Sequence, residues 1–285
     1  MTYPVRPGSS IVVDLPDEAY HRMPELSSSQ AKALLESPAK FDYWRGKVRP
    51  PKSEYDLGHA VHAKVLGIGA DVVEIPNDLL SADGGIRSNA AKEWVQQARD
   101  EGRVPLKSSE LRPINDAAEA VLRHDKAAAL LSQPGNPEVS ILTIDPVTDV
   151  PLRARFDYLP YPRSPRAIGV DLKTSRDASP RGFAKAVHDF SYDLQQEWYR
   201  HCYRLATGEE IEFAFVVVEL EPPYLVGYYN LSDAFMEMGR AKGAEARALF
   251  AECTRTGIWP GYDDDVITLE PPFWAAVAFE EKQNA

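Results

Sequence analysis

Three short runs near the middle of the chain have the composition of β-strands, and they restrict the fold more than any other feature. Each run is apolar, rich in β-branched and aromatic residues, and bounded by turn-forming residues. The runs occupy residues 138–144, 152–159 and 167–172. The proline-rich segment 160–165 separates the second run from the third, as a chain reversal between antiparallel strands requires. The pattern therefore predicts a hairpin within a β-sheet.

Helical and strand patterns alternate after this hairpin. Residues 183–207 read as one long helix, which Gly208 closes as a typical residue after a helix end. Residues 211–220 form a strongly apolar run, as expected for a central strand, and residues 224–230 form its hairpin partner. A last helix is expected at residues 232–255. This order of elements predicts an α/β fold with a mixed sheet.

The first third of the chain is predicted to be helical. Ser27 and Gln30 have the spacing of a capping box, and Ser37 followed by Pro38 ends one helix and starts the next. Further helices are expected at residues 55–66, 88–101 and 111–131. We therefore predict one domain over residues 1–285, with a helical N-terminal part (20–135), an α/β core (136–256) and a C-terminal tail (257–285).

The composition is that of a soluble globular protein, with 44% hydrophobic and 26% charged residues. No run approaches the roughly 18 apolar residues of a membrane span, and the first residues lack the pattern of a secretory signal. Two cysteines are too few for a disulfide framework, so a cytoplasmic location is expected. The net charge of −11 argues against a nucleic-acid partner, but segment 40–52 is rich in Lys and Arg.

The residues best suited to chemistry lie on the predicted hairpin. Side chains alternate along a strand, so Asp157 shares a face with Arg153 and Arg155, and Asp171 shares a face with Lys173. Two aspartates and a lysine that meet at one end of a sheet suit phosphodiester hydrolysis, because carboxylates hold Mg²⁺ and the metal activates a water. The alternative is a solvated strand edge. The apolar run before Asp171 favours a buried and functional carboxylate.

Four motifs resemble a known family. Asp157 followed by Asp171-Leu172-Lys173 resembles the acid and (Asp/Glu)-x-Lys signature of the PD-(D/E)XK nucleases. The helical segments 58–62, Gly-His-Ala-Val-His, and 195–199, Gln-Gln-Glu-Trp-Tyr, resemble the Gly-x-x-x-His and Gln-x-x-x-Tyr elements of one branch of that superfamily. The serines at 27–29 with Ser-Pro-Ala at 37–39 resemble the N-terminal pattern of RecE-like phage exonucleases, of the exodeoxyribonuclease VIII type. The resemblance covers roughly residues 20–205.

The resemblance implies a restriction-endonuclease-like core, a mixed sheet flanked by helices, with a helical N-terminal elaboration. It also implies one or two Mg²⁺ or Mn²⁺ ions in the active site. Lys173 would act on the attacking water, while Gln195 and Tyr199 would position the substrate. The metal ligands would be His62, Asp157, Asp171 and the backbone carbonyl of Leu172, with Glu138 as an additional acidic group.

Each of these roles has a structural alternative. A lone helical histidine such as His62 is often structural, and Glu138 could be an exposed residue at the start of a strand. Tyr192, Gln195 and Tyr199 form one helical stripe that could simply pack on the sheet, although an amide is unusual in a plain core. Arg153 and Arg155 could contact phosphate or pair with neighbouring residues. The aromatic and basic residues of segment 40–52 could hold a DNA end or cover the core.

The resemblance implies 5′ to 3′ digestion of linear double-stranded DNA from its ends, in phage-type recombination. The implied partners are a single-strand annealing protein and further copies of the chain in a ring such as a tetramer, with no membrane. Two rivals remain, an endonuclease or single-strand nuclease on the same fold and a non-enzymatic DNA-binding module. The chain departs from the pattern at Phe156, where the motif name has proline. Four-cysteine clusters and a Walker A motif are absent from the sequence.

Overall fold

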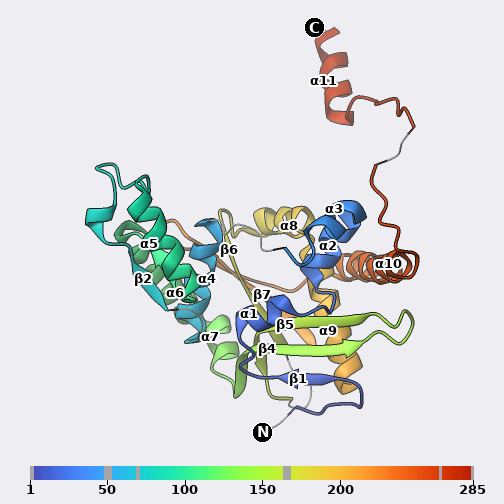
Figure 1. Ribbon diagram of the computed structural model, residues 1–285, viewed down its shortest axis with the longest axis horizontal. Coiled ribbons are helices and arrows are strands. Elements are labelled where there is room, and N and C mark those ends of the chain that lie inside the picture. Colours follow the sequence, from blue (N-terminus) through green and yellow to red (C-terminus); the bar gives the residue numbers. More distant parts are fainter. Residues whose placement is uncertain (1–2, 48–52, 69–70, 163–167, 263–264, 284–285) are drawn as a thin grey trace.

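A six-stranded β-sheet forms the centre of the protein in the computed structural model, which describes residues 3–47, 53–68, 71–162, 168–262 and 265–283 (Figure 1). Five of its strands come from the segment that the sequence predicted as the α/β core. In their order across the sheet, the strands are β1 (Ser10–Val12), β4 (Gly135–Ile144), β5 (Pro151–Pro160), β6 (Ile168–Ser175), β7 (Glu212–Glu219) and β8 (Val226–Tyr229).

The sheet is mixed, as predicted. β6 runs parallel to β7, whereas the other neighbouring pairs of this sheet are antiparallel. A parallel pair needs a long crossover connection, which α8 (Pro180–Asp189) and α9 (Tyr192–Thr207) provide between β6 and β7. The predicted hairpins are present as β5–β6 and β7–β8, although residues 163–165 of the predicted proline-rich turn lie outside the described residues.

Strand β7 separates two apolar layers. Phe213 and Phe215 pack in a cluster with Trp198 of α9, while Ala214 and Val216 pack in a second cluster on the opposite face. All four β7 side chains are buried. Burial on both faces explains why this strand reads as a continuous apolar run instead of an alternating one.

Helices cover the face of the sheet that carries Phe213 and Phe215. Ser27 starts the first of them with the predicted capping box, in which its side chain and that of Gln30 each accept from the other's backbone N–H. The side chain of Ser37 caps the next helix, with Pro38 in the first turn. Besides α8 and α9, the helices on this side are α2 (Ser28–Glu36), α3 (Pro38–Trp44) and α10 (Asp233–Thr256), which packs over α2 and α9.

The opposite face is covered by helices from the N-terminal part of the chain. These are α4 (Ser53–Leu66), α6 (Ser108–Arg123) and α7 (Asp125–Leu131). A two-stranded parallel sheet of β2 (Val72–Glu74) and β3 (Val104–Leu106) lies farther out with α5 (Asn89–Asp100) (Figure 1). The remaining elements are α1 (Asp17–Arg22), the 3₁₀ turn η1 (Asn77–Leu79) and α11 (Phe273–Gln283).

The structure departs from the predicted elements at three places. The helix predicted at 183–207 is two helices, because Ser191 adopts a left-handed φ of 50° that a continuous helix excludes. The helix predicted at 111–131 is also two, and the His124 side chain caps the second. The predicted helical part (20–135) is not purely helical, since β2 and β3 pair within it; β1, which precedes it, pairs with β4 in the main sheet. Among the described residues, every helix is too short or too polar to traverse a lipid bilayer.

Candidate active site

The two aspartates of the predicted motif face each other across the β5–β6 hairpin. Tyr158 of β5 pairs with Val170 of β6, and this antiparallel register places Asp157 opposite Asp171. Residues opposite each other in an antiparallel pair project to the same side of the sheet. The hairpin therefore brings the two aspartates together, as the alternation of the sequence predicted.

Glu138 extends this pair onto a third strand. The ladder pairs on both sides of it place Glu138 of β4 opposite Asp157. Its backbone has a left-handed φ of 50°, a conformation that costs a non-glycine residue on the order of 1–3 kcal/mol and that concentrates at functional sites. One carboxylate oxygen lies 3.6 Å from Nη1 of Arg155. Glu138 is thus part of a row of three acidic residues on β4, β5 and β6.

His62 of α4 reaches the same place from the helical layer. Its Nε2 lies 2.7 Å from the carbonyl oxygen of Leu172, and because a carbonyl can only accept, Nε2 is the donor. Its Nδ1 lies 3.5 Å from Oδ2 of Asp157. The same Oδ2 accepts the backbone N–H of Leu172 at 2.6 Å. Asp157 therefore stands between a helical histidine and the backbone of β6.

Three of these residues form a cluster that fits a divalent cation. His62, Glu138 and Asp157 each offer a ligand atom, and the three atoms lie within 4.8 Å of one another. Two carboxylates and an imidazole are a donor set found in divalent metal sites. With Nε2 engaged by the Leu172 carbonyl, Nδ1 is the nitrogen that faces Asp157 and remains for a metal.

The electrostatics of the cluster also favour an added positive charge. Burial raises the pKa of Glu138 to about 8, with the negative charge of Asp157 as the next cause. Burial raises the pKa of Asp157 as well, against the opposing effect of His62. Neighbouring carboxylates with raised pKa values resist ionising together. A cation held between Glu138 and Asp157 would remove that resistance.

Asp171 has different partners. It is 1% exposed, its Oδ1 accepts from Nε2 of Gln195 at 2.5 Å, and its Oδ2 lies 2.5 Å from Nζ of Lys173. Burial alone would lower the pKa of Lys173, but the charges of Asp171 and Asp157 outweigh it and raise that pKa. Lys173 is therefore a protonated ammonium beside the carboxylates. Asp171 is thus held at the site by its contacts with Lys173 and Gln195. Its role as a metal ligand stays a prediction.

The α9 helix supplies Gln195 from the opposite side of the sheet. Nε2 of Gln195 is 3.4 Å from Oη of Tyr199 one turn later. The ring of Tyr199 packs on Phe156 and Phe213, with centroids 5.2 and 5.9 Å away, and burial raises its pKa well above 10. Both interpretations of this helical stripe therefore apply to part of it. Tyr199 packs on the sheet, and Gln195 donates a hydrogen bond to the carboxylate of Asp171.

Residues 27–267 match a family described as PDDEXK-like domain of unknown function (DUF3799). The chain belongs to this family. No curated protein matches the sequence. Asp171-Leu172-Lys173, which lies within the matched range, is the predicted (Asp/Glu)-x-Lys motif of this chain, and its catalytic role stays a prediction.

A solved structure similar to this PDDEXK-like chain comes from Eubacterium rectale and is designated "Putative exonuclease". The TM-score is 0.57 at 11% sequence identity, and the similarity covers 94% of this chain and 99% of the other. A second structure, that of SSO0001, covers 73% of this chain and 87% of its own at 17% identity, with a TM-score of 0.29. The first similarity concerns the fold. The predicted PD-(D/E)XK fold class, a mixed sheet flanked by helices, is confirmed, and membership of this family supports a nuclease.

Other candidate residues of the PDDEXK-like domain have structural partners. Arg153 is 2% exposed and donates to the backbone oxygen of Met23, so it does not present its guanidinium to a substrate. Phe41, from the basic segment 40–52, is a core residue beside Trp259. In the same segment Tyr43 is 61% exposed, and residues 48–52 lie outside the described part of the chain.

Gly58 of the Gly-x-x-x-His element is not forced to be glycine by crowding. A methyl group at this position would approach no closer than 3.7 Å to Oγ1 of Thr174, which is an ordinary van der Waals distance. Steric contact within the described chain therefore does not explain why the residue one turn before His62 is a glycine.

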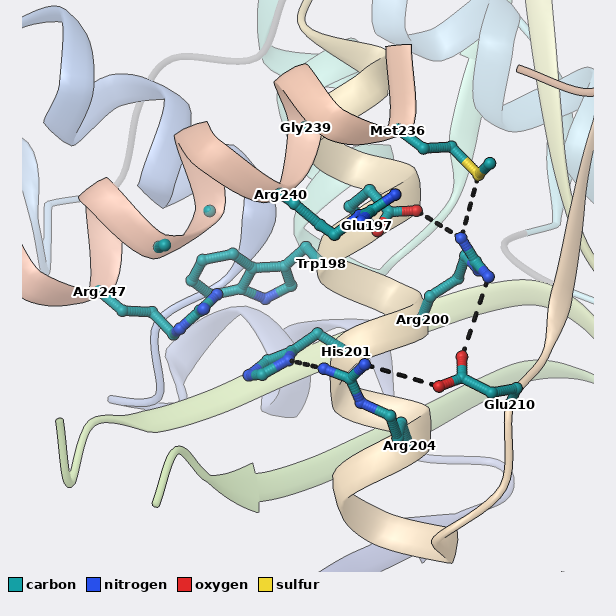
Figure 2. Close-up of a pocket in the computed structure, with 12 residues that line it drawn as sticks. Glu197, Trp198, Arg200, His201, Arg204, Glu210, Met236, Gly239, Arg240 and Arg247 are labelled. Carbon is teal, nitrogen blue, oxygen red and sulfur yellow. Dashed lines mark hydrogen bonds and ion pairs between the residues drawn. The ribbon is translucent and has the colours of Figure 1, made fainter. Parts of the chain in front are cut away.

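The remaining face of α9 lines a separate polar pocket. Figure 2 shows Arg200, His201 and Arg204 on one side of it, with Arg240 and Arg247 of α10 on the other. The pocket has a volume of about 490 Å³. Arginines that line it are paired with carboxylates, for example Arg200 with Glu197 at 2.6 Å. Arg240 of α10 pairs with the same Glu197 at 3.2 Å, and this ion pair joins α10 to the helix that carries Gln195.

The sequence did not single out Lys32 of α2. Its Nζ lies 5.2 Å from the centroid of the Tyr192 ring, and its pKa is influenced by Lys173 and Asp171. Lys32 and Lys173 are far apart in the sequence and come from different layers of the fold. The resemblance to a family pattern involved the serines at 27–29 in and next to this helix, but it did not involve Lys32.

Proposed function

We propose that this protein is a metal-dependent exodeoxyribonuclease that hydrolyses phosphodiester bonds of linear double-stranded DNA from 5′ to 3′. The observation that carries the proposal is the meeting of two groups of residues at one site. His62, Glu138 and Asp157 form the cluster suited to a cation, and Asp171, Lys173 and Gln195 form the adjoining hydrogen-bonded network. Metal-assisted phosphodiester hydrolysis uses both a cation and a positioned polar network.

The metal would be Mg²⁺ or Mn²⁺, held by His62, Glu138 and Asp157. Asp171 and the Leu172 carbonyl would complete the ligands of one or two ions. When bound, such an ion lowers the pKa of a coordinated water and offsets negative charge on the phosphate. A magnesium site of this kind keeps several waters and takes substrate oxygens as further ligands, so the protein needs to supply only part of the coordination.

Lys173 has an electrostatic role in this proposal. Hydrolysis adds water to phosphorus and breaks the bond to a sugar oxygen, and negative charge accumulates on the phosphate oxygens and the leaving oxygen. In the metal-free protein the aspartates raise the pKa of Lys173 against the effect of burial, which favours the ammonium form. In this proposal the ammonium, paired with Asp171, stabilises the developing charge. Gln195 holds Asp171 in place, and Tyr199 orients Gln195.

The direction and the substrate are supported by similarity. The Eubacterium rectale protein, which shares the fold, carries the word exonuclease in its designation, and the motifs of this chain resemble RecE-like phage exonucleases. By the same resemblance, we propose a role in phage-type recombination, a single-strand annealing protein as partner and a ring-shaped homo-oligomer such as a tetramer. An endonuclease on the same fold is the competing function.

The test uses the purified protein with Mg²⁺ or with EDTA. The substrates are linear duplexes labelled at the 5′ or the 3′ end, nicked circles and sealed circles. We expect early release of short labelled products from the 5′ label, intact sealed circles and no cleavage in EDTA. Efficient cutting of sealed circles would replace the exonuclease with an endonuclease. Absence of cleavage on every DNA, with the protein folded and metal present, would reject the nuclease.

A further inference from the structure

Lys32 lies beside the catalytic lysine, although the proposed reaction gives it no role. Its Nζ is 5.2 Å from the centroid of the Tyr192 ring, and Nζ of Lys173 is 4.9 Å from the same centroid. Tyr192 opens α9, and its ring stacks on Phe183 with centroids 6.0 Å apart, which holds the ring in place. Two ammonium groups, one from α2 and one from β6, therefore share one aromatic ring.

Lys32 differs from its lysine neighbours in its partners. Lys173 pairs with Asp171 at 2.5 Å, and Lys242 of α10 pairs with the buried Asp193 at 2.7 Å. Within the described chain, no carboxylate lies at ion-pair distance from Lys32. Burial, followed by the repulsion from Lys173, lowers the pKa of Lys32 to about 7. A half-buried lysine without an anionic partner is a costly arrangement unless something else supplies the negative charge.

The surrounding charge favours an anion at this place. Lys173 has the carboxylates of Asp171 and Asp157 beside it, and Lys242 has that of Asp193. The ammonium of Lys32 is therefore the one in this group of three lysines whose charge is not matched by an ion pair. Lysine binds phosphate as a compact point charge without a fixed geometry. The anion that would come to a site beside Lys173 in a nuclease is a phosphate of the nucleic acid.

We propose that Lys32, which shares the ring of Tyr192 with Lys173, forms a subsite for the phosphate that neighbours the scissile phosphate on the cleaved strand, while Lys173 acts on the scissile phosphate itself. This inference rests on the proposed nuclease function, since it assigns that phosphate to a DNA substrate. Two phosphates share the required chemistry, a terminal 5′-phosphate and an internal phosphodiester. Lys32 is a positioning residue in this proposal, because it holds the strand and does not touch the reacting atoms.

The test compares Lys32→Met with the wild type in steady-state cleavage of linear duplex in Mg²⁺. Methionine keeps the length and the apolar stem of the side chain while removing the charge. Lys32→Arg is the conservative variant. Lys126→Met is the matched control, because Lys126 is an exposed lysine that also lies over a tyrosine, with its Nζ 5.8 Å from the ring centroid of Tyr228.

Each variant is given three duplexes that differ at one phosphate. The first ends in a 5′-phosphate, the second ends in a 5′-hydroxyl, and the third carries an uncharged methylphosphonate at the internal linkage next to the first scissile one. The wild type should prefer the fully charged duplex by about tenfold in kcat/KM. Lys32→Met should raise KM on that duplex by about tenfold with kcat nearly unchanged, and should lose the preference.

The comparison in which Lys32→Met loses the preference of the wild type shows which phosphate occupies the subsite. Loss confined to the 5′-hydroxyl comparison assigns the subsite to the terminal phosphate, and loss confined to the methylphosphonate comparison assigns it to the internal linkage. Lys32→Arg should restore most of the preference, and Lys126→Met should behave as the wild type. A Lys32→Met protein that keeps both preferences, or that loses kcat with KM unchanged, overturns the subsite.

Failure of the subsite can be told apart from failure of the nuclease. If the wild type cleaves DNA but Lys32→Met shows no altered preference, only the subsite is rejected. If the wild type cleaves no DNA, fluorescence anisotropy with the same three oligonucleotides in EDTA gives the subsite its own measurement. Equal affinities of the wild type and Lys32→Met for all three would then reject the subsite as well.

Discussion

Gln195 of α9 and Asp171 of β6, which are separated in the sequence by α8, are joined by a buried hydrogen bond of 2.5 Å. The amide N–H of Gln195 donates to Oδ1, while Lys173 occupies the side of Oδ2. Asp171 is 1% exposed, so its carboxylate has little contact with water. Its two partners, Gln195 and Lys173, therefore determine the orientation of the carboxylate. Gln195 therefore supports the carboxylate for which we propose a catalytic role.

Replacing Gln195 should therefore affect the reaction more than the fold. Gln195→Ala leaves Oδ1 of Asp171 without its donor, and we expect kcat to fall by about 10–100-fold. Tyr199→Phe is the matched control, because it removes only a hydroxyl 3.4 Å from the same amide and keeps the ring against Phe156. It should reduce kcat by less than about fivefold. Equal losses in the two variants would show that Gln195 has no special relation to Asp171.

The Asp171–Lys173 pair allows activity and stability to be separated. Lys173→Met leaves the buried Asp171 without its counter-charge, and breaking a buried pair in this way costs about 3–5 kcal/mol. The double variant Asp171→Asn/Lys173→Met removes both charges and should recover most of that free energy of unfolding. Cleavage should be lost in all of these variants, by about 10³-fold or more. Urea unfolding and a cleavage assay measure the two effects, and a double variant as unstable as Lys173→Met would contradict the pairing.

Glu138 should make the metal-free protein less stable as the pH rises. Burial raises its pKa to about 8 in the folded state, from 4.5 as the ordinary value, so the folded state binds more protons than the unfolded state between these values. The free energy of unfolding then decreases with increasing pH, by up to about 1.4 kcal/mol per pH unit. Its stabilising effect is complete below about pH 4.5 and is lost by about pH 8. Asp157, whose pKa is also raised by burial, acts in the same direction.

Thermal unfolding in EDTA from pH 5 to pH 8 measures this effect. Glu138→Gln cannot ionise and should show a weaker fall of the melting temperature across the interval. Added Mn²⁺ should oppose the fall in the wild type, because a bound cation favours the ionised carboxylates. A slope that is the same in the wild type and in Glu138→Gln would assign the pH dependence to other groups.

Much of the sheet was predictable because its signals are local. The alternation along β5 and β6 and the apolar run of β7 depend on neighbours in sequence, so the hairpin was predicted, whereas the register that places Asp157 opposite Asp171 came from the structure. The break at Ser191 was not predictable in this way. No glycine or proline marks it, and its left-handed backbone follows from how α8 and α9 each pack on the sheet.

The site was predictable only to the extent that motifs mark it. The sequence proposed His62, Glu138 and Asp157 as ligands, and the fold brings these three together. Their ligand roles are still predictions. Lys32 lay outside every motif, because its place beside Lys173 depends on the packing of α2 against α9. The burial of Arg153 under Tyr20 likewise depends on tertiary packing, which strand alternation cannot show.

The contact between His62 and Asp157 leads to the last prediction, which concerns metal binding. Nε2 of His62 donates to the Leu172 carbonyl, so Nδ1 faces Oδ2 of Asp157 at 3.5 Å. In a neutral imidazole Nδ1 then carries a lone pair, and a lone pair facing a carboxylate is unfavourable unless a cation lies between them. Calorimetric titration with Mn²⁺ should therefore show affinity at least about tenfold weaker in His62→Ala and nearly abolished in Asp157→Asn. His59→Ala is the matched control, because His59 lies on the same helix but is exposed, and its affinity should equal that of the wild type. Unchanged affinity in His62→Ala would leave this histidine as a structural link between α4 and β6.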